Sequence, residues 1–227
     1  MRVLAIDTAL AACSAAVFDT LQGGIIARES LPMLRGHAEA LMPLIRRIMD
    51  DADTAFRDLD RVVVTTGPGS FTGLRVGIAA ARGIALAINK PAVGLSTLSA
   101  YAAPYLADDD NAPVVVAIDA RHSHVYLQVF AAGGRTVTGP RLAPLNEAVR
   151  AAAAAPARIV GSAAQLVGDG LAVTDATPLH VDAAGAPDID WVARMGAALP
   201  EGQAPPKPQY LRAPDAQPQN AAQLPRR

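Results

Sequence analysis

Two kinds of apolar pattern alternate along this chain. Residues 61–65 form an apolar, β-branched run, which predicts a buried strand, and the alanine- and leucine-rich residues 78–88 predict a helix. A second helix is predicted at residues 37–49, where buried-type residues recur at helical spacing: His37, Leu41, Leu44, Ile45 and Ile48. Strand-like and helix-like segments in alternation are typical of an α/β protein.

One strand pattern occurs twice. Residues 3–18 align without a gap with residues 115–130, and each copy reads as a strand that ends in an acid, Asp7 or Asp119, followed by a second strand. A Gly-Gly pair follows both copies. Because the acid and the glycines repeat along with the apolar residues, the pattern predicts two domains of one topology.

The domains are expected at residues 1–107 and 113–200, with the second one shortened. Residues 108–113 are acidic and turn-prone and mark the boundary. The first domain also has an expected strand at 92–95 and a helix from Ser96 to Leu106. For the second, the sequence predicts a helix at 145–155, a strand at 158–160 and a helix at 188–199.

The end of the chain differs in composition. From residue 201 onward Pro, Gln and Ala dominate and the periodicity vanishes, which predicts a largely disordered tail over residues 201–227. Tyr210 and Leu211 are the two residues of this tail expected to pack back on the fold.

Composition narrows the function classes. The chain has 227 residues, 51% of them hydrophobic, which is enough for a sizeable core, and a net charge of −1, which gives no basic footprint for nucleic acid or a membrane surface. A single cysteine, Cys13, excludes an internal disulfide and fits a reducing compartment. No apolar run is long enough to span a membrane, so we expect a cytoplasmic protein.

A glycine-rich run, GPGSFTGLRVG, occupies residues 67–77 between the predicted strand and helix. Such a turn can bind phosphate at the helix N-terminus, or it can allow a helix to pack closely on a neighbour. The lysine of a P-loop is absent, and Thr72 stands where Gly-x-Gly-x-x-Gly has its third glycine. Small residues such as Gly73, Gly77 and Ala81 favour close packing over phosphate binding.

The repeated acids leave two interpretations open. Duplicated domains with an acid after each first strand resemble the actin–hexokinase–sugar-kinase superfamily, in which two such turns hold nucleotide phosphates and a metal. The resemblance implies an α/β fold of two duplicated actin/hexokinase-like (ribonuclease H-like) domains, with mixed sheets flanked by helices. Asp7, Thr8 and Asp119 are therefore the candidate nucleotide residues. The turns after the acids contain no glycine, which favours simple turn capping by both aspartates.

Five motifs in order resemble the bacterial TsaB (YeaZ) family. They are Ala5-Ile6-Asp7-Thr8 with Cys13-Ser14, His37-Ala38-Glu39 with Leu41 and Pro43, residues 67–77, Gly94-Leu95-Ser96-Thr97-Leu98, and Pro208-Gln209-Tyr210-Leu211-Arg212. The resemblance covers most of residues 1–130 and the end of the ordered chain. Residues 140–200 add little to it.

The resemblance implies a role in making threonylcarbamoyladenosine in tRNA. The family member is the dimerization subunit, and a metal-containing paralogue, TsaD, transfers the threonylcarbamoyl group. The implied partners are a TsaD-type paralogue, a TsaE-type ATPase and a second copy of the chain, with tRNA reached only through the complex. No cofactor is implied for this chain itself, and a nucleotide at a complex interface stays open.

The resemblance also implies that this chain is not an enzyme by itself. The paralogue binds its metal through a His-x-x-x-His pair, and the matching positions here are Thr97 and Tyr101, neither of which is a usual ligand of iron or zinc. Two rival functions stay open, an ATP-binding enzyme of the actin/sugar-kinase superfamily and a metal-dependent glycoprotease-like protein.

The two first-domain helices are then the candidate partner surface. We expect their apolar, small-residue faces to pack on the paralogue or on a second copy, and Gly77→Leu or Ala81→Leu to abolish partner binding with little loss of fold. The candidate interface residues are His37, Leu41, Leu44, Ile45, Thr72, Arg75, Gly77, Ile78, Ala81 and Arg82.

Overall fold

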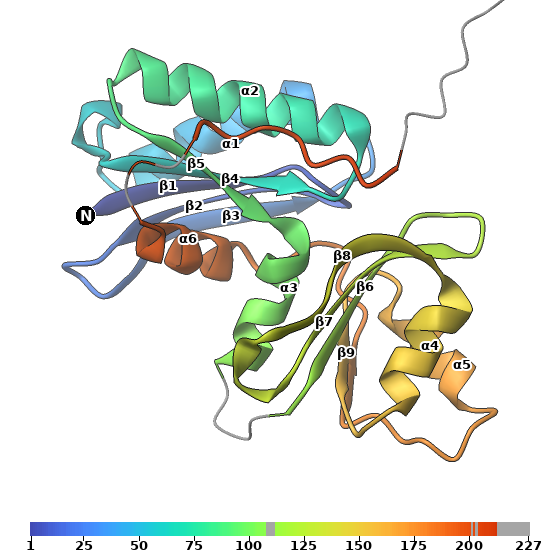
Figure 1. The fold of residues 1–227 in the computed structure, drawn as a ribbon. Helices are drawn as coiled ribbons and strands as arrows, with labels where there is room; N and C mark the ends of the chain where they lie inside the picture. Colours follow the sequence, from blue (N-terminus) through green and yellow to red (C-terminus); the bar gives the residue numbers. More distant parts are fainter. Residues whose placement is uncertain (108–111, 201, 203, 213–227) are drawn as a thin grey trace, which may run out of the picture.

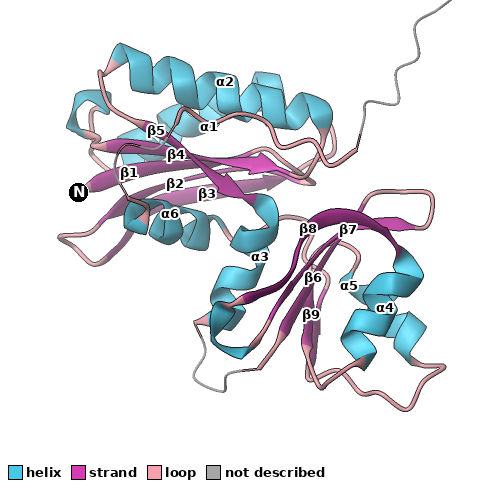
Figure 2. Ribbon diagram, in the orientation of Figure 1, coloured by secondary structure: helices cyan, strands magenta, loops and turns pink. Residues whose placement is uncertain are grey.

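The computed structural model describes residues 1–107, 112–200, 202 and 204–212. Figures 1 and 2 show two lobes, each built on one sheet with helices beside it. In the described part of the chain, no helix is both long and apolar enough to cross a membrane.

The sheet of the first lobe has five strands in the order β3-β2-β1-β4-β5. β1 pairs antiparallel with β2 and parallel with β4, so the sheet is mixed. Its side chains alternate between the two faces, as the pleat requires: Leu4 and Ile6 point to one core, Val3 and Ala5 to the other. The strands are β1 (Arg2–Asp7), β2 (Ala12–Asp19), β3 (Gly24–Pro32), β4 (Arg61–Gly67) and β5 (Ala92–Ser96).

The second lobe repeats this topology. Its order β10-β9-β6-β7-β8 is the first order read backwards, with β6 in the place of β1. β6 again pairs antiparallel with the next strand, β7, and parallel with β9. The predicted duplication and fold class are therefore confirmed. The strands are β6 (Val114–Asp119), β7 (His124–Phe130), β8 (Thr136–Pro144), β9 (Arg158–Val160) and β10 (His180–Asp182).

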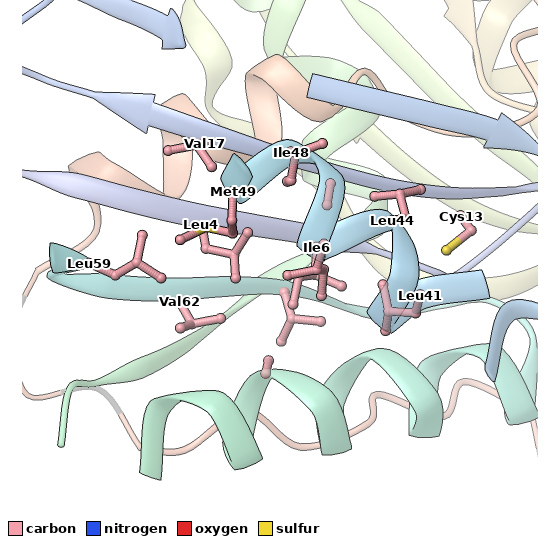
Figure 3. Packing of buried hydrophobic residues seen from close by; sticks show 14 of the residues in the cluster. Leu4, Ile6, Cys13, Val17, Leu41, Leu44, Ile48, Met49, Leu59 and Val62 are labelled. Atoms are coloured by element: carbon pink, nitrogen blue, oxygen red, sulfur yellow. The ribbon is translucent and has the colours of Figure 1, made fainter. Parts of the chain in front are cut away.

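Helices cover the sheets in pairs. α1 (His37–Asp51) and α2 (Phe71–Ala87) lie side by side on one face of the first sheet (Figure 1). Figure 3 shows Leu41 and Leu44 of α1 on the side of Ile6 and Cys13, and Met49, near the other end of α1, beside Leu4 of β1. α4 (Leu145–Ala153) and α5 (Ala164–Leu171) cover the second sheet in the same way.

The other faces of both sheets meet α3 (Thr97–Leu106), which leads from the first lobe to the second. Its buried residues Leu98 and Tyr101 pack with Val116 and Ile118 of β6. Two short 3₁₀ turns, η1 (Phe56–Asp58) and η2 (Ala132–Gly134), complete the fold.

The last helix corrects the sequence interpretation. The predicted helix at 188–199 forms, as α6 (Ile189–Ala198), but it packs on the first sheet rather than with residues 113–200. Ile189, Val192 and Ala193 join the core around Val3 and Val63. The amphipathic pattern predicts a buried face, but it carries no information on which of two sheets will cover that face.

The predicted disordered tail also needs correction. Residues 204–212, which we call the C-terminal strap, run along the first lobe beside α2 (Figure 1). The backbone N–H of Gln209 donates to Thr66 O at 2.7 Å, and Tyr210 stacks on Phe71. Thus Tyr210 and Leu211 do pack back, as expected. Residues 201, 203 and 213–227 of the predicted tail, and residues 108–111 of the predicted boundary at 108–113, lie outside the described residues.

Candidate functional site

Asp7 and Asp119 end equivalent strands and cap equivalent turns. Asp7 Oδ1 accepts from the N–H of Ala9 at 3.2 Å, and Asp119 Oδ1 accepts from the N–H of Arg121 at 2.7 Å. An aspartate that bonds the N–H two residues later forms an Asx turn. The turn-capping interpretation is therefore confirmed for both residues.

The two carboxylates differ in exposure. Asp7 is fully buried, and its Oδ1 also accepts from the Thr65 hydroxyl, whereas Oδ2 has no hydrogen-bond partner among the described residues. Burial raises the pKa of Asp7 to about 6, although the two hydrogen bonds and nearby His37 act to lower it. Asp119 is exposed. Only the second acid is therefore open to a ligand from solvent in this conformation.

The turn after Asp7 explains the glycine-rich motif. Thr8 Oγ1 donates to Gly73 O at 2.7 Å, and the Ser70 N–H donates to Ala9 O at 2.7 Å. A Cβ atom at Gly73 would overlap with Thr8 O, and one at Gly77 would overlap with Thr8 Oγ1. The glycines therefore let α2 approach this turn closely. Close packing is confirmed, but its partner is a turn of the same lobe and not a second helix.

The turn after Asp119 is strained and bulky. Arg121, His122 and Ser123 all have positive φ, between 52° and 63°, which L-residues adopt infrequently. His124 Nδ1 lies 2.7 Å from His122 O. Across the residues that the structure describes, no group of three or more His, Cys, Asp or Glu side chains is arranged to hold a metal ion.

A separate cavity of about 490 Å³ lies between β3 and the chain that leads into α6. Arg28, Ser30, Gly185 and Asp188 are among its lining residues, and neither Asp7 nor Asp119 lines it. It is therefore not part of the predicted nucleotide site.

The positions that match the paralogue's histidines are in the core. Thr97 is fully buried and Tyr101 is 3% exposed. The Tyr101 hydroxyl donates to Ala184 O at 2.9 Å, and burial raises its pKa above the ordinary value, with Asp7 and Asp182 adding to the effect. Neither side chain faces solvent.

Most candidate interface residues lie inside the first lobe. His37, Ile78 and Gly77 are buried, as are Leu41, Leu44, Ile45 and Ala81. They pack inside the lobe, as Figure 3 shows for Leu41 and Leu44, so they offer almost no surface to a partner. This corrects the expectation for Gly77→Leu and Ala81→Leu, because both changes would overfill the lobe's own core. The apolar spacing in α1 and α2 predicts a buried face on each helix, and the first sheet buries that face.

Three of the ten candidates, Thr72, Arg75 and Arg82, are exposed on α2. The sequence interpretation missed the exposed apolar residues of the same layer, Met42 on α1 and Leu86 on α2, which are 47% and 84% exposed. The sequence could have indicated both residues, because each is apolar but falls outside the helical spacing of the buried residues of its helix. We call Met42, Thr72, Arg75, Arg82 and Leu86 the α1–α2 outer face.

Comparison with known proteins gives related sequences along most of the chain. A model of the TsaD family, described as tRNA N6-adenosine threonylcarbamoyltransferase, matches residues 14–215. The tRNA threonylcarbamoyladenosine biosynthesis protein TsaB of Escherichia coli is 39% identical over 126 residues, which cover 56% of this chain and 53% of that protein. The match thus spans about half the length of this curated relative.

Other relatives match over nearly their full length. An uncharacterized protein of Mycobacterium tuberculosis is 36% identical over 224 residues, which cover 95% of this chain and 94% of that protein. The solved structure of YeaZ from Pseudomonas aeruginosa superposes with a TM-score of 0.77 at 27% identity, covering 92% of this chain and 99% of that one. Both the sequence and the two-lobed fold are therefore shared with this group.

Proposed function

Because this chain belongs to the TsaB (YeaZ) family, we propose that it is a noncatalytic subunit of the complex that makes threonylcarbamoyladenosine in tRNA. In this proposal the chain binds a TsaD-type paralogue, dimerises with itself when the paralogue is absent, and reaches tRNA only through the complex. A TsaE-type ATPase is a further partner, and the complex works in the cytoplasm. Threonylcarbamoyl transfer takes place in the paralogue.

The α1–α2 outer face is the observation that carries the partner role. Leu86 is 84% exposed and Met42 is 47% exposed, and both lie on the helical layer that covers one face of the first sheet. Arg75 and Arg82 are exposed on α2, and Arg82 precedes Leu86 by one helical turn. Methionine and arginine are enriched in protein interfaces, and burial of a large apolar side chain favours association by about 1.5–3 kcal/mol.

The noncatalytic part of the proposal rests on the buried positions. Thr97 and Tyr101 are in the core, and Asp7 is shielded from solvent, so these three residues are poorly placed to meet a substrate. The rival, an ATP-binding enzyme, requires Asp7 and Asp119 to hold a magnesium nucleotide. A stoichiometric heat of Mg-ATP binding to the chain alone, measured by calorimetry, would favour the rival.

Light scattering on a sizing column tests the partner role. We expect the chain alone to elute as a homodimer and to convert to a mixed complex when the TsaD-type paralogue of the same organism is added. Absence of any association, with or without nucleotide and the TsaE-type ATPase, would contradict the proposal.

A matched pair of variants tests the surface. Leu86→Glu places a charge on the α1–α2 outer face, and we expect it to weaken binding of the paralogue at least tenfold, which is about 1.4 kcal/mol. Val173→Glu is the control, since Val173 is 90% exposed but lies in the second lobe. Equal affinities for the two variants, measured by surface plasmon resonance, would move the interface away from these helices.

A further inference from the structure

The chain passes between the lobes at three places in its described part. α3 leads from the first sheet to the second, and residues 183–188 lead back from β10 to α6 on the first sheet. The C-terminal strap then follows α6 and returns to the second lobe. Two connections between lobes define a hinge, and a third contact away from them restricts rotation about it.

The strap is anchored to the first lobe by its aromatic residue. The Tyr210 ring stacks on Phe71 with centroids 4.8 Å apart, and Arg75 Nε donates to the Tyr210 hydroxyl at 3.0 Å. The Arg75 guanidinium also lies 3.7 Å from the centroid of Phe71. One residue earlier, the Gln209 N–H donates to Thr66 O at 2.7 Å. These contacts fix the strap to β4 and to the N-terminal part of α2.

The next two residues of the strap contact the second lobe. Arg212 Nη1 donates to Ala120 O at 2.8 Å, in the turn that follows Asp119. Leu211 packs against the cluster that joins Leu98 of α3 to Ile118 of β6. Leu10, from the turn that follows Asp7, packs against the same cluster. The end of the strap therefore contacts the turn after Asp119 and shares an apolar cluster with Leu10 of the turn after Asp7.

We propose that the C-terminal strap is a clasp that holds the two lobes at a fixed angle. Tyr210 holds one end and Arg212 holds the other, so the clasp fails when either anchor is lost. The Tyr210 anchor is reversible, because this side chain is 42% exposed and its partners lie at the surface. Release of the strap frees the hinge and opens the space between the turns after Asp7 and Asp119.

Distance measurements between spin labels test the clasp in the full chain. Leu21→Cys and Val173→Cys place labels at two sites that are each 90% exposed, one between β2 and β3 and one after α5, and the natural Cys13 is buried. We expect one narrow distance distribution in the parent. Tyr210→Ala and Arg212→Ala are each expected to broaden it or to add a second population. Lys207→Ala, which alters an exposed strap residue outside these contacts, is expected to leave it unchanged.

Amide hydrogen exchange separates a clasp from two local anchors. A clasp predicts that Tyr210→Ala, a first-lobe change, speeds exchange in residues 120–124 of the second lobe severalfold. Tyr210→Leu retains an apolar side chain and keeps the test informative if the alanine variant unfolds. Unchanged distance distributions in folded variants, or faster exchange only beside the altered anchor, would overturn the proposal.

Discussion

Single residues of the first turn show how local chemistry and packing combine. Asp7 and Asp119 repeat one Asx turn, yet Asp7 is buried and Asp119 is exposed. The sequence predicts the cap, since aspartate after a strand favours such a turn. It does not predict the burial of Asp7, which depends on neighbours far along the chain, such as Thr65 of β4, whose hydroxyl donates to Asp7 Oδ1.

Asp7→Asn should change how stability depends on pH. The pKa of Asp7 is about 6 in the fold and 3.8 for the ordinary group, so the folded state holds this proton more tightly. The contribution of the group is fully present below pH 3.8 and is lost as the pH rises through about 6. The free energy of unfolding of the parent therefore falls by an amount on the order of 3 kcal/mol over this pH range. The asparagine variant should not show this fall.

Urea unfolding between pH 4 and pH 8 measures this effect. The difference in free energy of unfolding, variant minus parent, should rise with pH and level off above about pH 7. Asp51→Asn, an exposed aspartate of α1, serves as the control and should show no such rise. Parallel curves for Asp7→Asn and the parent would count against a buried, neutralised carboxyl group.

Two glycines of α2 should respond in opposite directions to alanine. Gly73→Ala places a Cβ on the Thr8 carbonyl and should lower the free energy of unfolding by about 1–3 kcal/mol. Gly83 has open space around its Cβ position, so Gly83→Ala should raise stability by about 0.5–1 kcal/mol through helix propensity. Thermal and chemical unfolding of the two variants provide the comparison, and a loss of similar size in both would refute the assignment of Gly73 to close packing.

At the scale of elements, periodicity predicted most helices and long strands. Strands at 3–7 and 61–65 and helices at 37–49 and 145–155 form close to the expected residues. β10 was not predicted, because its three residues, His180–Asp182, include a single apolar side chain, whereas the equally short β9 carries both Ile159 and Val160. The position of α6 was also beyond the sequence, because its contacts with Val63 and Arg61 connect residues far apart in the chain.

Arg61 fixes α6 to the first sheet. Its buried Nη1 donates to Gly196 O at 2.8 Å and to Leu199 O at 2.7 Å, which satisfies carbonyls at the end of the helix. Arg61→Met should therefore lower the free energy of unfolding by about 2–3 kcal/mol, since buried acceptors lose their donor. In the Arg61→Met variant, an increase in amide exchange relative to the parent that is larger in α6 than in α1 would show that the lost stability belongs to the attachment of α6.

Arg57→Met is the matched control, because the Arg57 side chain is 88% exposed. It should change stability by less than about 0.5 kcal/mol. If Arg61→Met were equally mild in guanidinium unfolding, α6 would be held by its apolar face alone.

For the whole molecule, the sequence predicts the duplication but not the connections that bring the copies together. The repeated acid and Gly-Gly pair identify two copies of one topology. The strap contacts depend instead on Gln209 N–H, a backbone group, and on Tyr210 in a segment without periodicity. Most residues expected at the partner surface are buried for a related reason, since apolar spacing in α1 and α2 marks the side that meets the sheet. Met42 and Leu86 lie outside that buried stripe and are exposed.

The position of α6 sets an order of events during protein synthesis. One face of the first sheet is complete only when α6 leaves the ribosome, and α6 is translated after every strand of the second sheet. Translation adds ~5–20 residues per second, so several seconds pass between synthesis of the first sheet and synthesis of α6. During this time α6 does not yet cover Val3, Ala5 and Val63. A chain stalled or cleaved before Ile189 would therefore expose a sheet face to chaperones and proteases, even though all five strands of that lobe have already been made.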